Sequence, residues 1–230
     1  MATLVCFGFG YCAEHFMAEF GGKFERVIGT VRRAERAGIL NSYQAGAMRA
    51  VVFDGVLETP ELSAAITAAD YALISVPPDA SGDPVLAACG GALAGRRNLR
   101  SVVYLSTVGV YGDHGGGWVD EQTPPAPRSE RSRWRIAAEQ AWQRFGAQHS
   151  VPVAVLRLAG IYGPDRMRSL RSRAAKRAAS SSWARFSIAF TSAISRRRSR
   201  PLSRAAPPAC STSPTTSRHL TPIRSCSPRR

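Results

Sequence analysis

The chain has 230 residues, of which 31 are Lys or Arg and 16 are Asp or Glu, so its formal net charge is +15. This length fits one large domain or two small ones, and no apolar run approaches the roughly 20 residues of a membrane-spanning helix. The N-terminus lacks the charged start and cleavage site of a secretory signal, which predicts a cytoplasmic protein. The five cysteines form no Cys-x-x-Cys pair, which indicates reduced thiols and no metal site.

The excess of positive charge is confined to the C-terminal part of the chain. Residues 1–164 hold 15 basic and 15 acidic residues, whereas residues 165–230 hold 16 basic residues and a single acidic one, Asp165. The last glycine is Gly163 and the last valine is Val155. So basic a segment with so few apolar residues cannot offset its chain entropy by burial. The sequence therefore predicts a balanced domain followed by a disordered, low-complexity tail rich in Arg, Ser and Pro.

The first element expected is a buried parallel strand over residues 3–7. It leads into Gly8-Phe9-Gly10-Tyr11-Cys12-Ala13, a G-x-G-x-x-A form of the dinucleotide-binding fingerprint. In this motif Gly8 allows a tight turn, Gly10 lets the backbone approach a pyrophosphate, and Ala13 allows close packing of the following helix. The candidate cofactor-binding residues of this motif are Gly8, Phe9, Gly10, Tyr11 and Ala13. The alternative is a glycine turn that binds no ligand.

A helix is expected over residues 13–20, ended by Gly21-Gly22, where a left-handed cap is expected. The second strand is expected over residues 26–31 and is followed by Arg32 and Arg33. NAD-binding domains place an acidic residue near this strand end, whereas two guanidinium groups suit the 2′-phosphate of NADP. We therefore predict NADP as the cofactor, with NAD as the second choice. The alternative is that both arginines only form the solvated start of the next helix.

Three further strands are expected over residues 50–54, 69–76 and 101–105. A helix is expected to begin at Asp83-Pro84, because Asp is a good N-cap and Pro suits the first helical position. Asp54 and Ser75 lie near the ends of their strands and are further candidate cofactor-binding residues. Strands that alternate with helices in this order predict an α/β fold, a doubly wound parallel sheet of the Rossmann type.

Two Tyr-Gly motifs point to a known family. Residues 102–113, which read Val-Val-Tyr-Leu-Ser-Thr-Val-Gly-Val-Tyr-Gly-Asp, resemble the short-chain dehydrogenase/reductase superfamily. Residues 156–164, Leu-Arg-Leu-Ala-Gly-Ile-Tyr-Gly-Pro, resemble the later strand and turn of its extended or atypical branch, the NAD-dependent epimerase/dehydratase group. The resemblance covers residues 3–164. It implies an NAD(P)-dependent oxidoreductase or epimerase acting on a small carbonyl or sugar-nucleotide-like substrate, in a family in which homodimers are common.

The resemblance also implies catalytic positions, two of which depart from the family pattern. A Ser or Thr after the fifth strand polarises the substrate there, and a Tyr four residues before a Lys transfers the proton. Thr107 matches the hydroxyl position, although it could equally bond nearby backbone. Alignment on residues 137–139, Ala-Ala-Glu, places Arg131 at the Tyr position and Arg135 at the Lys position. Because arginine stays protonated near neutral pH, Arg131 cannot transfer a proton, whereas Arg135 is expected to bind the nicotinamide ribose.

Impaired catalysis is therefore expected in this chain. Tyr111, Asp113 and His114 are the nearest substitutes in sequence, although a histidine in such a glycine-rich loop is usually only solvated. The second interpretation is a non-catalytic dinucleotide-binding protein. The third is a protein whose basic tail binds nucleic acid without sequence preference.

The tail stands where the family has its substrate-binding half. With suitable codons, residues 187–195 read in a neighbouring frame encode Leu-Asn-Arg-Ile-His-Val-Gly-Asp-Ile, which resembles a segment of that half. We hypothesise a frameshift near residue 165. The test is whether a neighbouring reading frame of the encoding DNA encodes the family's C-terminal half.

Overall fold

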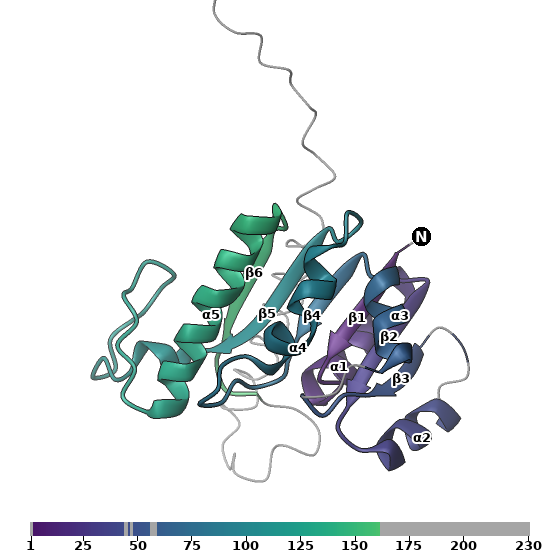
Figure 1. The fold of residues 1–230 in the computed structure, drawn as a ribbon. Helices are drawn as coiled ribbons and strands as arrows, with labels where there is room; N and C mark the ends of the chain where they lie inside the picture. The colour runs from purple at the N-terminus through teal and green to yellow at the C-terminus, as the bar shows by residue number, and fades with distance from the viewer. Residues whose placement is uncertain (1, 44–45, 47, 56–58, 162–230) are drawn as a thin grey trace, which may run out of the picture. The chain divides into compact units, whose positions relative to one another are not determined.

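A computed structural model describes residues 2–43, 46, 48–55 and 59–161 (Figure 1). The predicted tail over residues 165–230 lies outside the described residues. Among the helices that the structure describes, none combines the length and apolarity needed to cross a bilayer.

The described strands form one parallel sheet with the order β3-β2-β1-β4-β5-β6. The strands are β1 (Thr3–Phe7), β2 (Arg26–Val31), β3 (Met48–Val52), β4 (Tyr71–Ile74), β5 (Ser101–Thr107) and β6 (Val153–Leu158). Strand order reverses between β1 and β4, and in such sheets ligands bind outside the carboxyl ends of the strands at this switch point. The predicted Rossmann-type fold is confirmed.

Helices and short 3₁₀ turns connect the strands. They are α1 (Tyr11–Phe20), η1 (Gly21–Lys23), α2 (Ala34–Tyr43), α3 (Pro60–Ala68), α4 (Pro84–Ala94), η2 (Val108–Tyr111) and α5 (Glu130–His149). Side-chain oxygens of Thr59, Asp83 and Ser129 accept backbone N–H groups and cap α3, α4 and α5. The predicted helix start at Asp83-Pro84 is thus confirmed.

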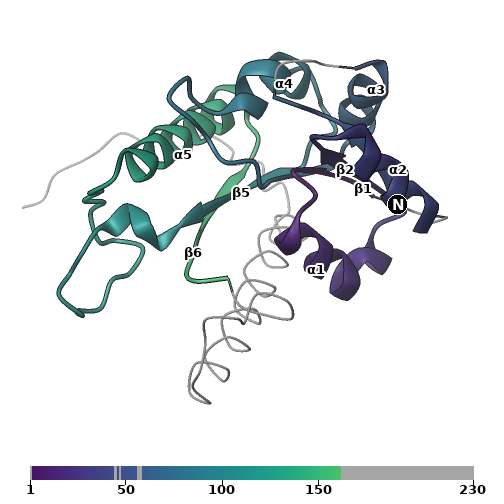
Figure 2. The same ribbon diagram turned by 90° about the horizontal axis from the view of Figure 1, so that it is seen from below.

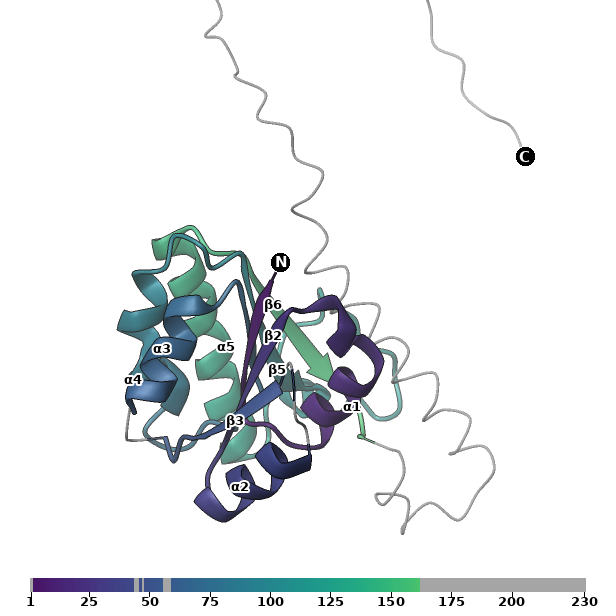
Figure 3. The ribbon, with the colours of Figure 1, turned by 90° about the vertical axis from the view of Figure 1, so that its right-hand side faces the viewer.

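The sheet separates two hydrophobic clusters. Helices α3, α4 and α5 lie on one face of the sheet, and α1 lies on the other (Figures 2 and 3). The first cluster is centred on Tyr104 and Trp142, whose ring centroids are 6.4 Å apart. The second includes Phe16, stacked on Phe20 at 5.2 Å, and it also contains residues of α2. Both faces are covered, as a parallel sheet requires.

The end of α1 differs from the prediction. Gly21 has a right-handed conformation, with φ −54°, and continues into η1 instead of forming a left-handed cap. Its carbonyl accepts the Phe24 N–H at 3.0 Å. This tight turn brings the Phe24 ring to 6.2 Å from that of Phe16, so packing of an aromatic residue determines how the helix ends.

Candidate functional site

The glycine turn after β1 is held by β2. Gly8 has φ +85°, and a Cβ there would lie 3.1 Å from the Val76 nitrogen and 3.2 Å from the Ser75 carbonyl carbon. Its N–H donates to Thr30 Oγ1 at 2.9 Å, and the Phe9 N–H donates to the Thr30 carbonyl at 2.6 Å. Both the conformation and the close approach of the backbone that follows β4 therefore require glycine at this position.

The space in front of Gly10 is open. Its N–H donates to the Gly8 carbonyl at 2.9 Å, no side chain caps α1, and a Cβ on Gly10 would meet nothing within 4 Å. The positive end of a helix with such space before it suits a phosphate group. The residues present therefore fit the pyrophosphate of a dinucleotide.

Two residues of the fingerprint, Phe9 and Ala13, have buried side chains that pack in the hydrophobic core. Ala13 is fully buried, as close packing of α1 demands. The Phe9 ring is also buried and lies where a Cβ on Gly29 would approach it to 2.6 Å. The Phe9 N–H is already bonded to the Thr30 carbonyl, so a direct contact of Phe9 with a cofactor stays a prediction. Gly29 in β2, which makes room for this ring, is a residue that the sequence reasoning missed.

The remaining candidates on this edge follow neighbouring strands. The Tyr11 ring, at the start of α1, contacts the His15 ring in a tilted arrangement with centroids 4.0 Å apart. Ser75 follows β4, and its N–H donates to the Phe7 carbonyl at 2.8 Å. Asp54 lies two residues beyond β3 and is exposed. The fold thus brings Tyr11, Ser75 and Asp54 to the carboxyl edge of the sheet, and their role in cofactor binding stays a prediction.

Arg32 and Arg33 are exposed at the end of β2, two and three residues beyond Thr30. Within the described ranges neither guanidinium has a hydrogen bond or an ion pair. The Arg33 carbonyl accepts the Ala37 N–H at 3.2 Å, so Arg33 stands at the start of α2. Their positive charges are therefore available to an anionic ligand beside the glycine turn.

Thr107 ends β5 at the same edge and is half-buried. Its Oγ1 accepts the Gly109 N–H at 3.2 Å and caps η2. The backbone-bonding role considered for this hydroxyl is thus present. The hydroxyl can still donate its own proton, so its role toward a substrate stays a prediction.

The two arginines of α5 differ in their surroundings. Arg131 is exposed in the first turn of the helix. Arg135 reaches the sheet, where its Nη1 donates to the Leu105 carbonyl at 2.9 Å and to the Tyr104 hydroxyl at 3.3 Å. Burial raises the pKa of Tyr104 to about 12, so its phenol remains protonated. Arg135 therefore ties α5 to β5 and keeps further N–H donors for a ligand.

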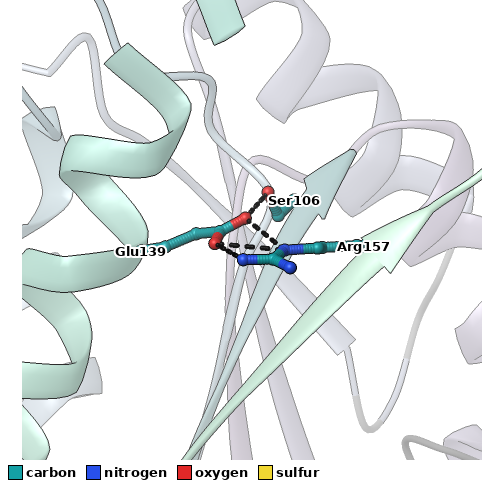
Figure 4. A network of polar contacts seen from close by, with 3 residues as sticks. All are labelled: Ser106, Glu139 and Arg157. Carbon is teal, nitrogen blue, oxygen red and sulfur yellow. Dashed lines mark hydrogen bonds and ion pairs between the residues drawn. The ribbon is translucent and has the colours of Figure 1, made fainter. Parts of the chain in front are cut away.

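A buried charged network includes Ser106, the residue before Thr107, together with Glu139 and Arg157 (Figure 4). Glu139 of α5 is only 3% exposed, and it accepts a hydrogen bond from the Ser106 hydroxyl. Arg157 of β6 donates to Glu139 Oε2 through Nη2 at 2.8 Å and through Nε at 3.2 Å. These bonds raise the pKa of Arg157. Its guanidinium lies 4.8 Å from the Tyr111 ring centroid, so four elements meet at this network.

The sequence reasoning used Glu139 only as an alignment marker and missed this network. The available signal was the four-residue spacing of Arg135 and Glu139, which places both on one side of a helix.

Asp113 and His114, which were considered as replacements for the missing proton-transferring tyrosine, lie in the exposed loop after η2. Asp113 pairs with Arg128 at 3.1 Å, and the Gly115 N–H together with that guanidinium lowers the Asp113 pKa. His114 Nε2 lies 3.1 Å from the Tyr111 carbonyl oxygen. Asp113 is thus an ionised acceptor that stabilises the loop rather than a proton donor.

The sheet order and the glycine turn define a Rossmann-type α/β domain. A sequence model of the NAD dependent epimerase/dehydratase family matches residues 83–199, about half of the chain. The chain belongs to this family, which confirms the resemblance of its Tyr-Gly motifs. The match continues past the change of composition at residue 165.

Solved structures share the fold. A conserved protein of unknown function from Silicibacter pomeroyi is 40% identical, with a TM-score of 0.61, over 72% of this chain and 56% of that one. UDP-glucuronic acid 4-epimerase from Bacillus cereus, in complex with NAD, is 19% identical, with a TM-score of 0.57, over 72% and 59%. dTDP-glucose 4,6-dehydratase from Bacillus anthracis, also with NAD, is 19% identical, with a TM-score of 0.56, over 71% and 56%.

The chain thus spans 56–59% of the length of these three structures. The comparison with curated protein sequences found no match.

Proposed function

We propose that this chain binds a nicotinamide dinucleotide at the carboxyl edge of β1, β2 and β4, and that it prefers NADP. The observation that carries this proposal is the turn at Gly8 and Gly10, which is open to a phosphate and anchored by Thr30. Arg32 and Arg33 come directly after β2, the strand that holds Thr30, and their side chains have no partner in the described part of the chain. The family's name and the NAD bound to two structural neighbours support a dinucleotide.

In this arrangement the chain's own residues bind and orient the cofactor. Backbone N–H groups at the start of α1 hold the pyrophosphate, and the two arginines after β2 hold the 2′-phosphate. Arg135 positions the ribose next to the nicotinamide with the donors that β5 leaves free. A bound nicotinamide supplies hydride transfer.

The acid–base step is the weak point of the site. Thr107 offers a hydroxyl to a small carbonyl or sugar-nucleotide-like substrate, but Arg131 keeps its proton and lies exposed. We therefore expect little or no turnover. A non-catalytic dinucleotide-binding protein is the second candidate function, and the fixed charge of Arg131 favours it.

Cofactor preference is tested by measuring the Kd of NADPH and NADH for the full chain and for Arg32→Ala and Arg33→Ala. Each variant removes a charge-assisted phosphate contact, so we expect about a tenfold loss of NADPH affinity and an unchanged NADH affinity. Arg97→Ala, an exposed arginine in the α4–β5 connection, is the matched control and leaves both values unchanged. Equal wild-type affinities for the two cofactors would contradict the assignment of the 2′-phosphate.

Catalytic impairment is tested by restoring the family pair with Arg131→Tyr and Arg135→Lys together. NADPH oxidation is followed at 340 nm with a panel of small carbonyl compounds and sugar nucleotides. We expect the double variant to exceed the wild type, because a phenol beside an ammonium group can transfer a proton. A wild type that turns over a substrate as fast as the double variant would contradict impairment.

A further inference from the structure

An ion pair joins the two helices that begin at the proposed phosphate-binding edge. Arg36 Nη2 of α2 contacts Glu14 Oε1 of α1, with side chains 51% and 35% exposed. Glu14 stands one turn after Gly10, whose carbonyl accepts its N–H at 2.9 Å. Arg36 stands three residues after Arg33, just under one turn further along. The pair therefore joins the helix that follows Gly10 to the helix that follows Arg33.

Only one of the three arginines at this edge is paired with a carboxylate. Of the guanidinium groups of Arg32, Arg33 and Arg36, only that of Arg36 is paired within the described ranges, and its partner is Glu14. Ion pairs this exposed are weak and readily exchanged. A phosphate monoester offers three acceptor oxygens and close to two negative charges, and therefore competes well for a guanidinium.

We propose that Glu14 determines how strongly this edge discriminates nucleotides that carry a 2′-phosphate. In the absence of phosphate it holds Arg36, and when a phosphate binds at Arg32 and Arg33, Arg36 exchanges the carboxylate for the phosphate. The inference rests on the proposed function, because it assumes a phosphate at these two arginines. Glu14 lowers the affinity for that phosphate in two ways. It competes for Arg36, and its negative charge repels the phosphate.

The test compares adenosine 2′,5′-bisphosphate with adenosine 5′-monophosphate, which differ only in the 2′-phosphate. Calorimetry gives the Kd of both for the full chain and its variants. We expect Glu14→Gln to tighten the bisphosphate about threefold and Arg36→Gln to weaken it about threefold, with a smaller change for the monophosphate. In the double variant the gain from Glu14→Gln shrinks, because its competition for Arg36 is gone.

Glu35→Gln is the matched control, since Glu35 is an exposed acid next to Arg36 that forms no ion pair with it in the described structure. We expect it to change bisphosphate affinity less than Glu14→Gln does. An equal gain in both variants, or an equal change for both ligands, would overturn the inference while leaving the proposed function intact. If the wild type does not distinguish the two ligands, the proposed preference for NADP fails and the inference fails with it.

Discussion

At the scale of single residues, Gly8 and Gly10 have separable roles. Gly8→Ala places a side chain in a strained conformation, with φ +85°, against the backbone of Ser75 and Val76. We expect it to lower the free energy of unfolding by about 1–3 kcal/mol. Gly10→Ala adds a methyl group in open space with φ −118°, so its urea unfolding midpoint should match the wild type. An unfolding midpoint for Gly8→Ala as high as that of Gly10→Ala would show that the turn is not fixed as described.

Which site residues are predictable depends on whether the backbone or a distant side chain decides their role. The spacing of Gly8, Gly10 and Ala13 is a local backbone requirement, and it is readable directly. The burial of the Phe9 ring depends on Gly29, twenty residues away in another strand. The Glu14 partner of Arg36 likewise requires the packing of two helices, which periodicity alone does not give.

At the scale of elements, the network of Figure 4 joins β6 to α5. Glu139→Ala leaves Arg157 without its partner, with 22% of the Arg157 side chain exposed. We expect a loss of about 3 kcal/mol in urea unfolding, the lower end for a broken buried pair. Glu139→Gln should cost less, because an amide oxygen still accepts. Adding Arg157→Leu to Glu139→Ala should recover part of the loss. If Glu139→Ala alone unfolds at the wild-type midpoint, the network does not stabilise this edge.

The buried Tyr104 of β5, which contacts Arg135 of α5, should make the free energy of unfolding depend on pH. Burial raises the pKa of Tyr104 from 10.0 to about 12. Between about pH 10 and 12 the folded chain therefore keeps a phenol proton that the unfolded chain loses. The free energy of unfolding therefore falls as pH rises, by about 1.4 kcal/mol per unit for one such group. Tyr104→Phe should remove this part of the slope in urea unfolding between pH 10 and 12. Identical slopes in both proteins would contradict the burial of the phenol. The buried Cys6, whose pKa also rises to about 12, contributes equally to both.

The elements themselves were largely predictable from sequence, but their contacts were not. Apolar runs bounded by glycine and proline predict the strands and their alternation with helices along the chain. Asp83-Pro84 predicts the start of α4. Ser106, Glu139 and Arg157 meet only because β5 pairs with β6 and α5 covers that pair. Contacts between residues so far apart in sequence cannot be predicted from the periodicity of any single segment.

At the scale of the whole molecule, the excess of positive charge is confined to residues 165–230. Residues 1–164 carry equal numbers of acidic and basic residues, so the excess of +15 lies beyond them. We expect the full chain to be retained on heparin at low salt and a chain shortened to residues 1–164 to pass through. NADPH affinity should be the same for both. Equal retention of the two chains would place a basic surface on the domain itself.

The binding of a dinucleotide at the glycine turn is tested most directly by an NADPH titration of the full chain, followed by nicotinamide fluorescence. We predict a saturable signal for the wild type and an affinity at least about tenfold lower for Gly10→Ala, whose methyl group occupies the space of the pyrophosphate. Gly22→Ala, equally open and remote from the turn, is the control and should bind as the wild type does. No saturable signal from the wild type, or equal affinities of Gly10→Ala and Gly22→Ala, would contradict the site.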